Sequence, residues 1–372
     1  MHLIAVNLWV WVRTVILEEY EVSREIDNAQ YENAHALFVP LSNVNLSKVQ
    51  KIGSSEESGE HDKFQTSHGD DDDILHLVMG CANTESCFMR QTFGPIMSTC
   101  TIEYSLIAAC VMYVLWRNIG MPISAEHKAR KRSLRVDCSS STTGMFAGLV
   151  FLVGTFVSMI IFYSKMSTNR DADALWVFSL THTALYLASI VACIFGIWRM
   201  RAMSYDSDRH ATGAKLLEDI LLIVGLIGQL LFSISGIVGL AGASQRDDVS
   251  PALYAVLGAH AVRLLQVLLQ TVFILGASQL VATTSKLQAT KPGREIVTFM
   301  MVVNMALFLV NTFEGQKASV NRALVDFYGI ETWALVVQST MPLSIFYRFH
   351  SSVCLAEIWK HSYRVHVRPI TL

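Results

Sequence analysis

The stretch that decides the fold is LLEDILLIVGLIGQLLFSISGIVGLAG, residues 216–242. Its strongly polar members are Glu218, Asp219 and Gln229, and the first two stand near its start. A helix crosses the hydrocarbon core of a bilayer with about 20 mostly apolar residues. This run therefore predicts a membrane-spanning helix.

The composition of the 372-residue chain agrees with that prediction. Hydrophobic residues make up 52% and charged residues 16%, with a mean hydropathy of +0.39, whereas a soluble domain carries about 25% charged residues. The net charge of −2 gives no reason to expect nucleic acid as a partner. The seven cysteines form no Cys-x-x-Cys pair, so neither a disulfide scaffold nor a zinc module is expected. We expect an all-α polytopic membrane protein.

The rest of the chain repeats the apolar pattern. Eight segments qualify as spans, roughly 3–19, 94–116, 144–164, 174–198, 216–242, 252–282, 296–313 and 331–353. Lys and Arg concentrate in 117–143, 199–215, 283–295 and the tail after 353, which fall on one side only if all eight spans are counted. Because basic loops stay cytoplasmic, both Met1 and Leu372 are predicted to lie inside.

The connection 20–93 is then extracellular. It is polar, with the acidic run Asp70–Asp73, and it is typical of a disordered segment. Asn45-Leu46-Ser47 is a glycosylation sequon on this predicted outer side. Cys81 and Cys87 share the loop and could pair or stay free.

Ionisable and amide groups inside the spans are the candidate functional residues, because a charge near a helix centre costs about 2.5–3.5 kcal/mol on insertion scales. Glu18 ends the first span and Glu103 lies within the second. Arg263, Gln266 and Gln270 share one helical face of the sixth span. The remaining candidates are His260 in the sixth span, Asn304, Asn311 and Glu314 in the seventh, and Gln338, Arg348 and His350 in the eighth.

Each candidate has a structural alternative. Gln229, Asn304 and Asn311 could simply hydrogen-bond neighbouring helices. Arg348 and His350 stand near the cytoplasmic end, where their side chains are expected to reach the headgroups. Glu218 and Asp219 begin a helix, where the helix dipole stabilises them. Glu103 is different, because so deep a carboxylate must be paired, solvated or protonated.

Several motifs are absent from the sequence. It has no His-x-x-x-His, Gly-x-Ser-x-Gly or phosphate-binding Gly-Lys-Ser/Thr motif, so an enzyme is not expected, and neither are a resident cofactor or metal. It has no arginine-rich voltage sensor and no Thr-Val-Gly-Tyr-Gly filter. The residues alone leave a channel, a transporter or a receptor open.

Dispersed strings resemble the otopetrin family of proton-selective channels. They are NLWVWVRTVILE (7–18), TIEYSLIAA (101–109) with YVLWRNIG (113–120), LQTVFIL (269–275), KPGREIVTF (291–299), LVNTFE (309–314) and PLSIFYRFHSSVCLAEIWK (342–360). The similarity covers almost everything except residues 20–92.

The resemblance implies two barrel-like six-helix halves per subunit in a homodimer. Matched by motif, this chain starts at the family's fifth helix, so the sequence would lack the first four helices. The implied organisation is an N-half helix at 1–19, an extracellular loop at 20–93, the last N-half helix at 94–117, a basic linker at 118–143, the C half at 144–353 and a cytoplasmic tail at 354–372.

The resemblance also implies an activity. Otopetrins pass protons across the plasma membrane down their gradient, are activated by extracellular acid and are blocked by zinc; membrane lipid or sterol is the other partner expected. The alternatives are a receptor or structural membrane protein that does not conduct, or a solute transporter.

Individual residues match family positions. Glu18 and Glu103 match acidic positions of the N half, Glu218 and Asp219 match an acidic pair that opens a helix, and Gln270 and Asn311 match polar C-half positions. This chain has Gln338 where many vertebrate relatives carry a histidine, so an acid–histidine pair between Glu18 and position 338 cannot form. The predicted proton-pathway residues are Glu18, Glu103, Glu218, Asp219, His260, Arg263, Gln266, Gln270, Asn311, Glu314, Gln338, Arg348 and His350.

Overall fold

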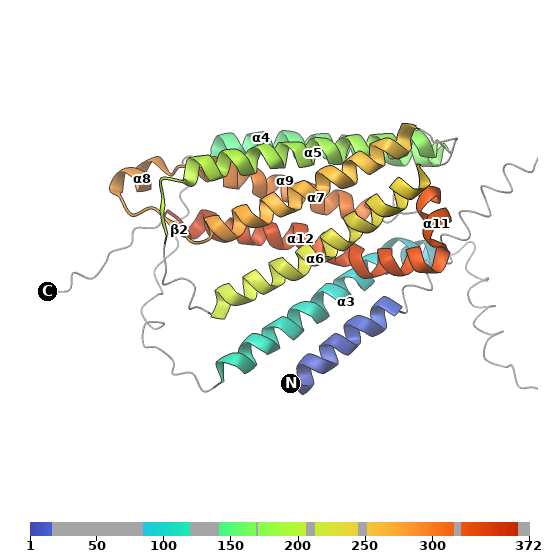
Figure 1. The fold of residues 1–372 in the computed structure, drawn as a ribbon, viewed down its shortest axis with the longest axis horizontal. Helices are drawn as coiled ribbons and strands as arrows, with labels where there is room; N and C mark the ends of the chain where they lie inside the picture. Colours follow the sequence, from blue (N-terminus) through green and yellow to red (C-terminus); the bar gives the residue numbers. More distant parts are fainter. Residues whose placement is uncertain are drawn as a thin grey trace, which may run out of the picture. The chain divides into compact units, whose positions relative to one another are not determined.

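The computed structural model describes residues 1–16, 85–119, 141–168, 170–205, 213–244, 251–315 and 321–363, and most of these residues are helical (Figure 1). An N-terminal helix runs over His2–Ile16. The longer helices are α3 (Glu85–Asn118), α4 (Thr142–Ser167), α5 (Asp171–Met200), α6 (Gly213–Ala243), α7 (Pro251–Ala277), α9 (Arg294–Phe313) and α12 (Ile330–His361). The short elements are α8 (Ser285–Thr290), α11 (Arg322–Tyr328) and the antiparallel strands β1 (Ser204–Tyr205) and β2 (Leu280–Val281).

Six of the described helices are long and apolar enough to cross a membrane. They are Cys100–Asn118 within α3, and α4, α5, α6, α7 and α9. The first predicted span corresponds to the shorter apolar helix His2–Ile16. The eighth lies within α12, which is long but rich in polar residues. The structure therefore leaves the count of eight as a prediction.

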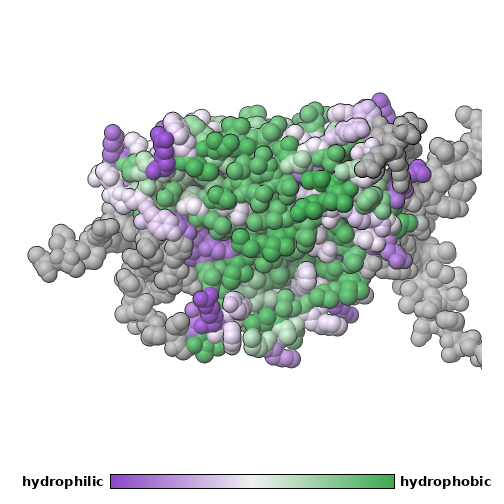
Figure 2. Space-filling model, viewed as in Figure 1, coloured by the Kyte–Doolittle hydropathy of each residue, from purple (hydrophilic) through white to green (hydrophobic). Residues whose placement is uncertain are grey.

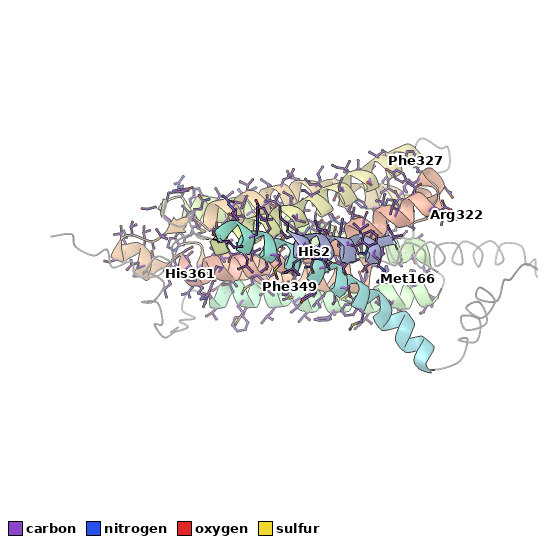
Figure 3. All side chains as sticks on the ribbon, turned by 90° about the horizontal axis from the view of Figure 1, so that it is seen from below. His2, Met166, Arg322, Phe327, Phe349 and His361 are labelled. Carbon is purple, nitrogen blue, oxygen red and sulfur yellow. The ribbon has the colours of Figure 1, made fainter. Side chains whose placement is uncertain are left out.

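The helices after residue 141 close into a ring. Around this ring α4 packs on α5, α5 on α7, α7 on α6, α6 on α12, α12 on α9, and α9 again on α4. Further contacts join α5 to α9 and α7 to α12 across the ring. Met166 and Arg322 lie at one end of the bundle and His361 at the other (Figure 3).

The ring has an apolar exterior and an interior that contains both apolar and polar side chains. Exposed positions of α4 and α5 carry large apolar side chains such as Val150, Ile160, Leu180 and Val191. One face of the molecule shows apolar residues across its middle and hydrophilic residues towards its two ends (Figure 2). Many buried side chains are instead amides, hydroxyls, imidazoles and guanidiniums. An apolar exterior, with polar groups kept inside and away from lipid, is the arrangement that a bilayer favours.

Glycines let neighbouring helices approach closely. A Cβ on Gly144 of α4 would lie 1.8 Å from the carbonyl oxygen of Glu295 at the start of α9, and one on Gly148 would lie 2.7 Å from Val302 Cβ. Gly144 and Gly148 are four residues apart, so both belong to one face of α4. On α6, a Cβ on Gly228 would lie 2.2 Å from Leu343 Cβ of α12. Small residues at such spacing are typical of membrane helix interfaces, where close packing replaces the hydrophobic drive.

The Gly144 contact gives a test of the ring. Gly144→Leu should lower the midpoint of thermal unfolding and the fraction of monodisperse protein in mild detergent, because the clash is with backbone that cannot rotate away. Overpacking of this kind costs about 1–3 kcal/mol or more. Gly154→Leu is the control, since a Cβ there would meet nothing within 4 Å. Equal behaviour of the two variants would contradict the α4–α9 packing.

Candidate functional site

A continuous chain of side-chain hydrogen bonds crosses the interior of the ring. Arg348 Nη1 on α12 donates to Gln266 Oε1 on α7 at 2.7 Å. Gln266 Nε2 donates to Gln270 Oε1 at 2.6 Å, and Gln270 Nε2 donates to Asn304 Oδ1 on α9 at 2.8 Å. Asn304 Nδ2 donates to the backbone oxygen of Met300 at 2.9 Å. Each of these four side chains is buried, so the chain joins three helices without reaching the surface.

A second cluster surrounds the buried Tyr186 of α5. Arg263 Nε of α7 donates to the Tyr186 hydroxyl at 2.7 Å. The guanidinium carbons of Arg263 and Arg348 lie 5.5 and 5.2 Å from the centroid of the Tyr186 ring. Tyr186 therefore stands beside both guanidiniums, and Arg348 connects this cluster to the amides.

His182 of α5 lies one turn from Tyr186, between two oxygens. Its Nε2 is 3.1 Å from Asn311 Oδ1 of α9, and its Nδ1 is 3.0 Å from the backbone oxygen of Phe178. A charged imidazolium donates to both oxygens. A neutral ring donates from Nδ1 and needs a donor at Nε2, which Asn311 supplies when its amide turns over. Asn311 Nδ2 has no other partner among the described residues, so the site can hold the ring in either protonation state.

Glu314 caps the C-terminus of α9, one turn beyond Asn311. Its side chain is fully buried, and neither carboxylate oxygen has a hydrogen-bond partner among the described residues. Burial raises the pKa of Glu314 to about 7. Tyr163 of α4, close enough to interact electrostatically with Glu314, donates its hydroxyl to the backbone oxygen of Phe313 at 2.5 Å.

Buried polar side chains recur at intervals along both α9 and α7. On α9, Glu314, Asn311 and Asn304 follow one another from the end of the helix inward. On α7, His260, Arg263, Gln266 and Gln270 occupy successive turns of one buried face. Asn311 pairs with His182 and Asn304 pairs with Gln270, so buried polar groups recur lengthwise along α9 from the Glu314 end toward Asn304. At a rise of about 1.5 Å per residue, residues 304 to 314 extend over roughly 15 Å of a membrane about 30 Å thick.

The predicted places of Arg348 and His350 were wrong. Both were expected to reach the headgroups, but Arg348 is fully buried against Gln266, Tyr186 and Tyr347. His350 is buried too, with its Nε2 2.9 Å from the backbone oxygen of Glu218 on α6. Both residues lie where α12 is enclosed by other helices, so their side chains have no path to lipid.

Other candidates occupy separate places. Gln229 Nε2 donates to the backbone oxygen of Ser344 at 3.0 Å, as the structural alternative for it anticipated. Glu218 and Asp219 lie near Lys215, at 3.9 and 2.7 Å, in the first turns of α6. His260 packs against Phe232, and its Nδ1 has no partner among the described residues. Gln338 is buried on α12. Glu103 lies on α3, where its Oε1 is buried without a partner among the described residues. Glu18, Asn45 and Cys81 lie outside the described residues, as does the side chain of Cys87.

Sequence reasoning missed His182 and Tyr186, which contact several of the predicted residues. His182 was detectable as an ionisable group in the predicted span 174–198, by the same criterion that selected Glu103. Tyr186 carried no comparable signal, because tyrosine is common in membrane helices. Among the described residues, no group of three or more His, Cys, Asp or Glu side chains could hold a metal ion.

Comparison with known proteins adds independent information. The sequence profile of the otopetrin family matches residues 1–349. Over 286 residues the chain is 36% identical to the proton channel OtopLc of Drosophila melanogaster, which covers 74% of this chain and 18% of that protein. It is 24% identical to the proton channel OTOP2 of Mus musculus, over 96% of this chain and 69% of that protein. With the proton channel OTOP3 of Homo sapiens it shares 22% identity, over 75% of this chain and 53% of that protein.

The chain thus spans under a fifth of the Drosophila relative and between about half and 69% of the two mammalian relatives. Its helices, its apolar exterior and the profile match agree that it is an all-α polytopic membrane protein. The chain belongs to the otopetrin family.

Proposed function

We propose that this chain conducts protons across the plasma membrane, down their gradient, as a proton-selective channel. The observation that carries the proposal is the series of buried polar groups between Glu314 and Asn304, which is arranged lengthwise inside a ring of apolar-faced helices. The names of its relatives, all proton channels, support it. We also propose the finer properties expected of the family: activation by extracellular acid, block by zinc, contact with membrane lipid or sterol, a homodimer, residues 144–353 as one half, and both termini in the cytoplasm.

The proposed mechanism is proton hopping. With the predicted orientation, Glu314 lies at the extracellular end of α9 and can take up a proton there, while His182 can hold one between Asn311 and Phe178. Hydroxyls such as Tyr186, Tyr347 and Thr271 can accept one proton while they release another. The amides of Gln270 and Asn304 orient water and hydroxyls rather than exchange protons themselves. In this mechanism, larger cations are excluded by apolar constrictions that are too narrow for a hydrated ion.

A second candidate function has one observation in its favour. Arg263 and Arg348 place positive charge at mid-depth in the ring, which opposes the passage of cations. A membrane receptor or structural protein that does not conduct would tolerate this charge. Patch clamp separates the two functions. An inward current evoked by external acid, with a reversal potential that follows the proton gradient, supports the channel, and surface expression without such a current supports the alternative.

Glu103 tests the contribution of the N-terminal helices. Its Oε1 is buried without a hydrogen-bond partner among the described residues, so a proton can bind there. Glu103→Gln should reduce the acid-evoked current about tenfold or more with surface expression intact, as expected for the loss of one proton-transfer group. Cys100→Ser, at an exposed position on the same helix, is the control. A current unchanged in Glu103→Gln would place the route in residues 144–353 alone.

His182 tests the route through the ring. His182→Phe keeps an aromatic ring between Phe178 and Tyr186 but removes both nitrogens, so the current should fall about 10²-fold or more. Surface biotinylation checks that the variant reaches the membrane. Thr183→Val, at the half-buried neighbouring position, should leave the current within about twofold. A normal current in His182→Phe would exclude the imidazole from the route.

Glu314 tests acid dependence. Because burial raises the pKa of Glu314 to about 7, its carboxyl is mostly neutral at pH 6 and mostly charged at pH 8. Glu314→Gln is neutral throughout, so the ratio of currents at external pH 6 and pH 8, taken at an equal proton driving force, should approach one. Glu331→Gln, at an exposed acid at the start of α12, should keep the ratio of the unmodified chain. An unaltered ratio in Glu314→Gln would assign acid dependence to another group.

A further inference from the structure

Two of the buried arginines in the ring, Arg263 and Arg348, have no acidic partner among the described residues. Arg348 is 0% exposed and Arg263 is 4% exposed. The ion pairs of the described residues join Lys165, Arg170, Lys215, Lys360 and His361 to acids near helix ends, and none of them includes Arg263 or Arg348. Two positive charges therefore share the interior without a carboxylate from the part of the chain that the structure describes.

The neighbours of these arginines offer rings and neutral dipoles. Arg263 lies over Phe232 at 5.1 Å and Tyr186 at 5.5 Å, and Arg348 lies over Tyr347 at 5.2 Å. Arg348 Nη1 donates to the neutral amide of Gln266. Ring faces and amide oxygens attract a cation, but they do not cancel its charge. A buried charge without a counter-charge is costly even after the protein relaxes around it.

One edge of Arg348 remains available as a donor. Its Nε and Nη2 atoms are buried and have no hydrogen-bond partner among the described residues. These two nitrogens lie on the same side of the planar guanidinium, where their N–H bonds are parallel. This is the edge with which arginine holds an anion in a two-point hydrogen bond.

We propose that the ring binds one small monovalent anion, a halide or a bicarbonate-type oxyanion, on the Nε–Nη2 edge of Arg348, within the field of Arg263. A single negative charge offsets one of the two guanidiniums and satisfies both unpartnered donors. The aromatic surroundings favour a weakly hydrated anion, which loses little hydration on entry. A divalent oxyanion is disfavoured, because it would lose far more hydration on entry into this interior. The proposal does not rest on proton conduction, since it is argued only from the charge balance of the interior.

Chloride itself is the probe, measured by the broadening of its ³⁵Cl nuclear magnetic resonance signal by the full chain in a non-ionic detergent. The unmodified chain should broaden the signal beyond detergent alone, and excess bromide should reverse the effect. Arg348→Gln should weaken binding about tenfold or more, because a hydrogen bond to a charged group contributes roughly 1.5–3 kcal/mol. Arg201→Gln, at an exposed arginine that lies over Trp198, is the matched control and should bind as the unmodified chain does.

Thermal unfolding gives the second readout. Replacement of gluconate, which is too large for the interior, by chloride at equal ionic strength should raise the unfolding midpoint of the unmodified chain by a few degrees. This rise should vanish in Arg348→Gln. If Arg348→Gln does not fold, the same loss of the chloride effect should be measured in Arg263→Gln. Bicarbonate in place of chloride shows which anion the site prefers.

The proposal fails if the unmodified chain neither broadens the chloride signal nor responds to the exchange of gluconate. It also fails if a folded Arg348→Gln variant binds chloride as Arg201→Gln does. A tyrosinate absorbance at neutral pH that disappears in Tyr186→Phe would overturn it as well, because the phenolate would then supply the negative charge.

Discussion

A polar side chain inside a membrane must find its partner within the protein, and this requirement organises the helices after residue 141. Arg348 donates a hydrogen bond to Gln266, Gln270 donates one to Asn304, and His182 lies against Asn311. Each of these contacts joins two different helices. Hydrocarbon offers no alternative partner, and separating these helices would leave buried donors and acceptors unpaired at about 1–3 kcal/mol each. The polar network that we propose as part of a proton route therefore also holds the ring together. A variant at Gln270 or Asn304 would change the packing of the helices as well as any conduction.

Close backbone approach supplies the other half of the packing. Gly144 and Gly148 bring α4 against α9, and Gly228 brings α6 against α12, which places α9 and α12 where their amide and guanidinium groups can meet α7. Polar contacts fix which helix faces point inward, because a rotated helix would turn its amides toward lipid. Glycine contacts fix how near the helices lie. Both are needed, since a hydrogen bond such as that between Gln270 and Asn304 tolerates only a few tenths of an ångström.

The sequence predicted the helical class and much of the network, for reasons that can be traced to particular residues. Arg263, Gln266 and Gln270 recur at helical spacing on an otherwise apolar segment, and the structure shows them on one buried face of α7. Arg348 was misplaced because distance along a helix does not show whether neighbouring helices cover that turn. His182 was overlooked although an imidazole at that depth is a signal. The partners of each residue, such as Asn311 for His182, depend on which helices are adjacent, and a pattern within one segment does not contain that information.

The positive layer at Arg263 and Arg348 constrains any proton route through the ring. At an effective dielectric constant of about 20, a proton that comes within about 7 Å of one guanidinium is repelled by roughly 2 kcal/mol, which slows its passage about thirtyfold. Two uncompensated guanidiniums would double that energy barrier. Passage of a proton through the ring would then be far slower than its transfer between Glu314 and His182, which does not cross the arginine layer. An anion on Arg348 would lower the barrier without any movement of the helices. The balance of charge around Tyr186 therefore decides whether the protons cross the ring or take a path outside it.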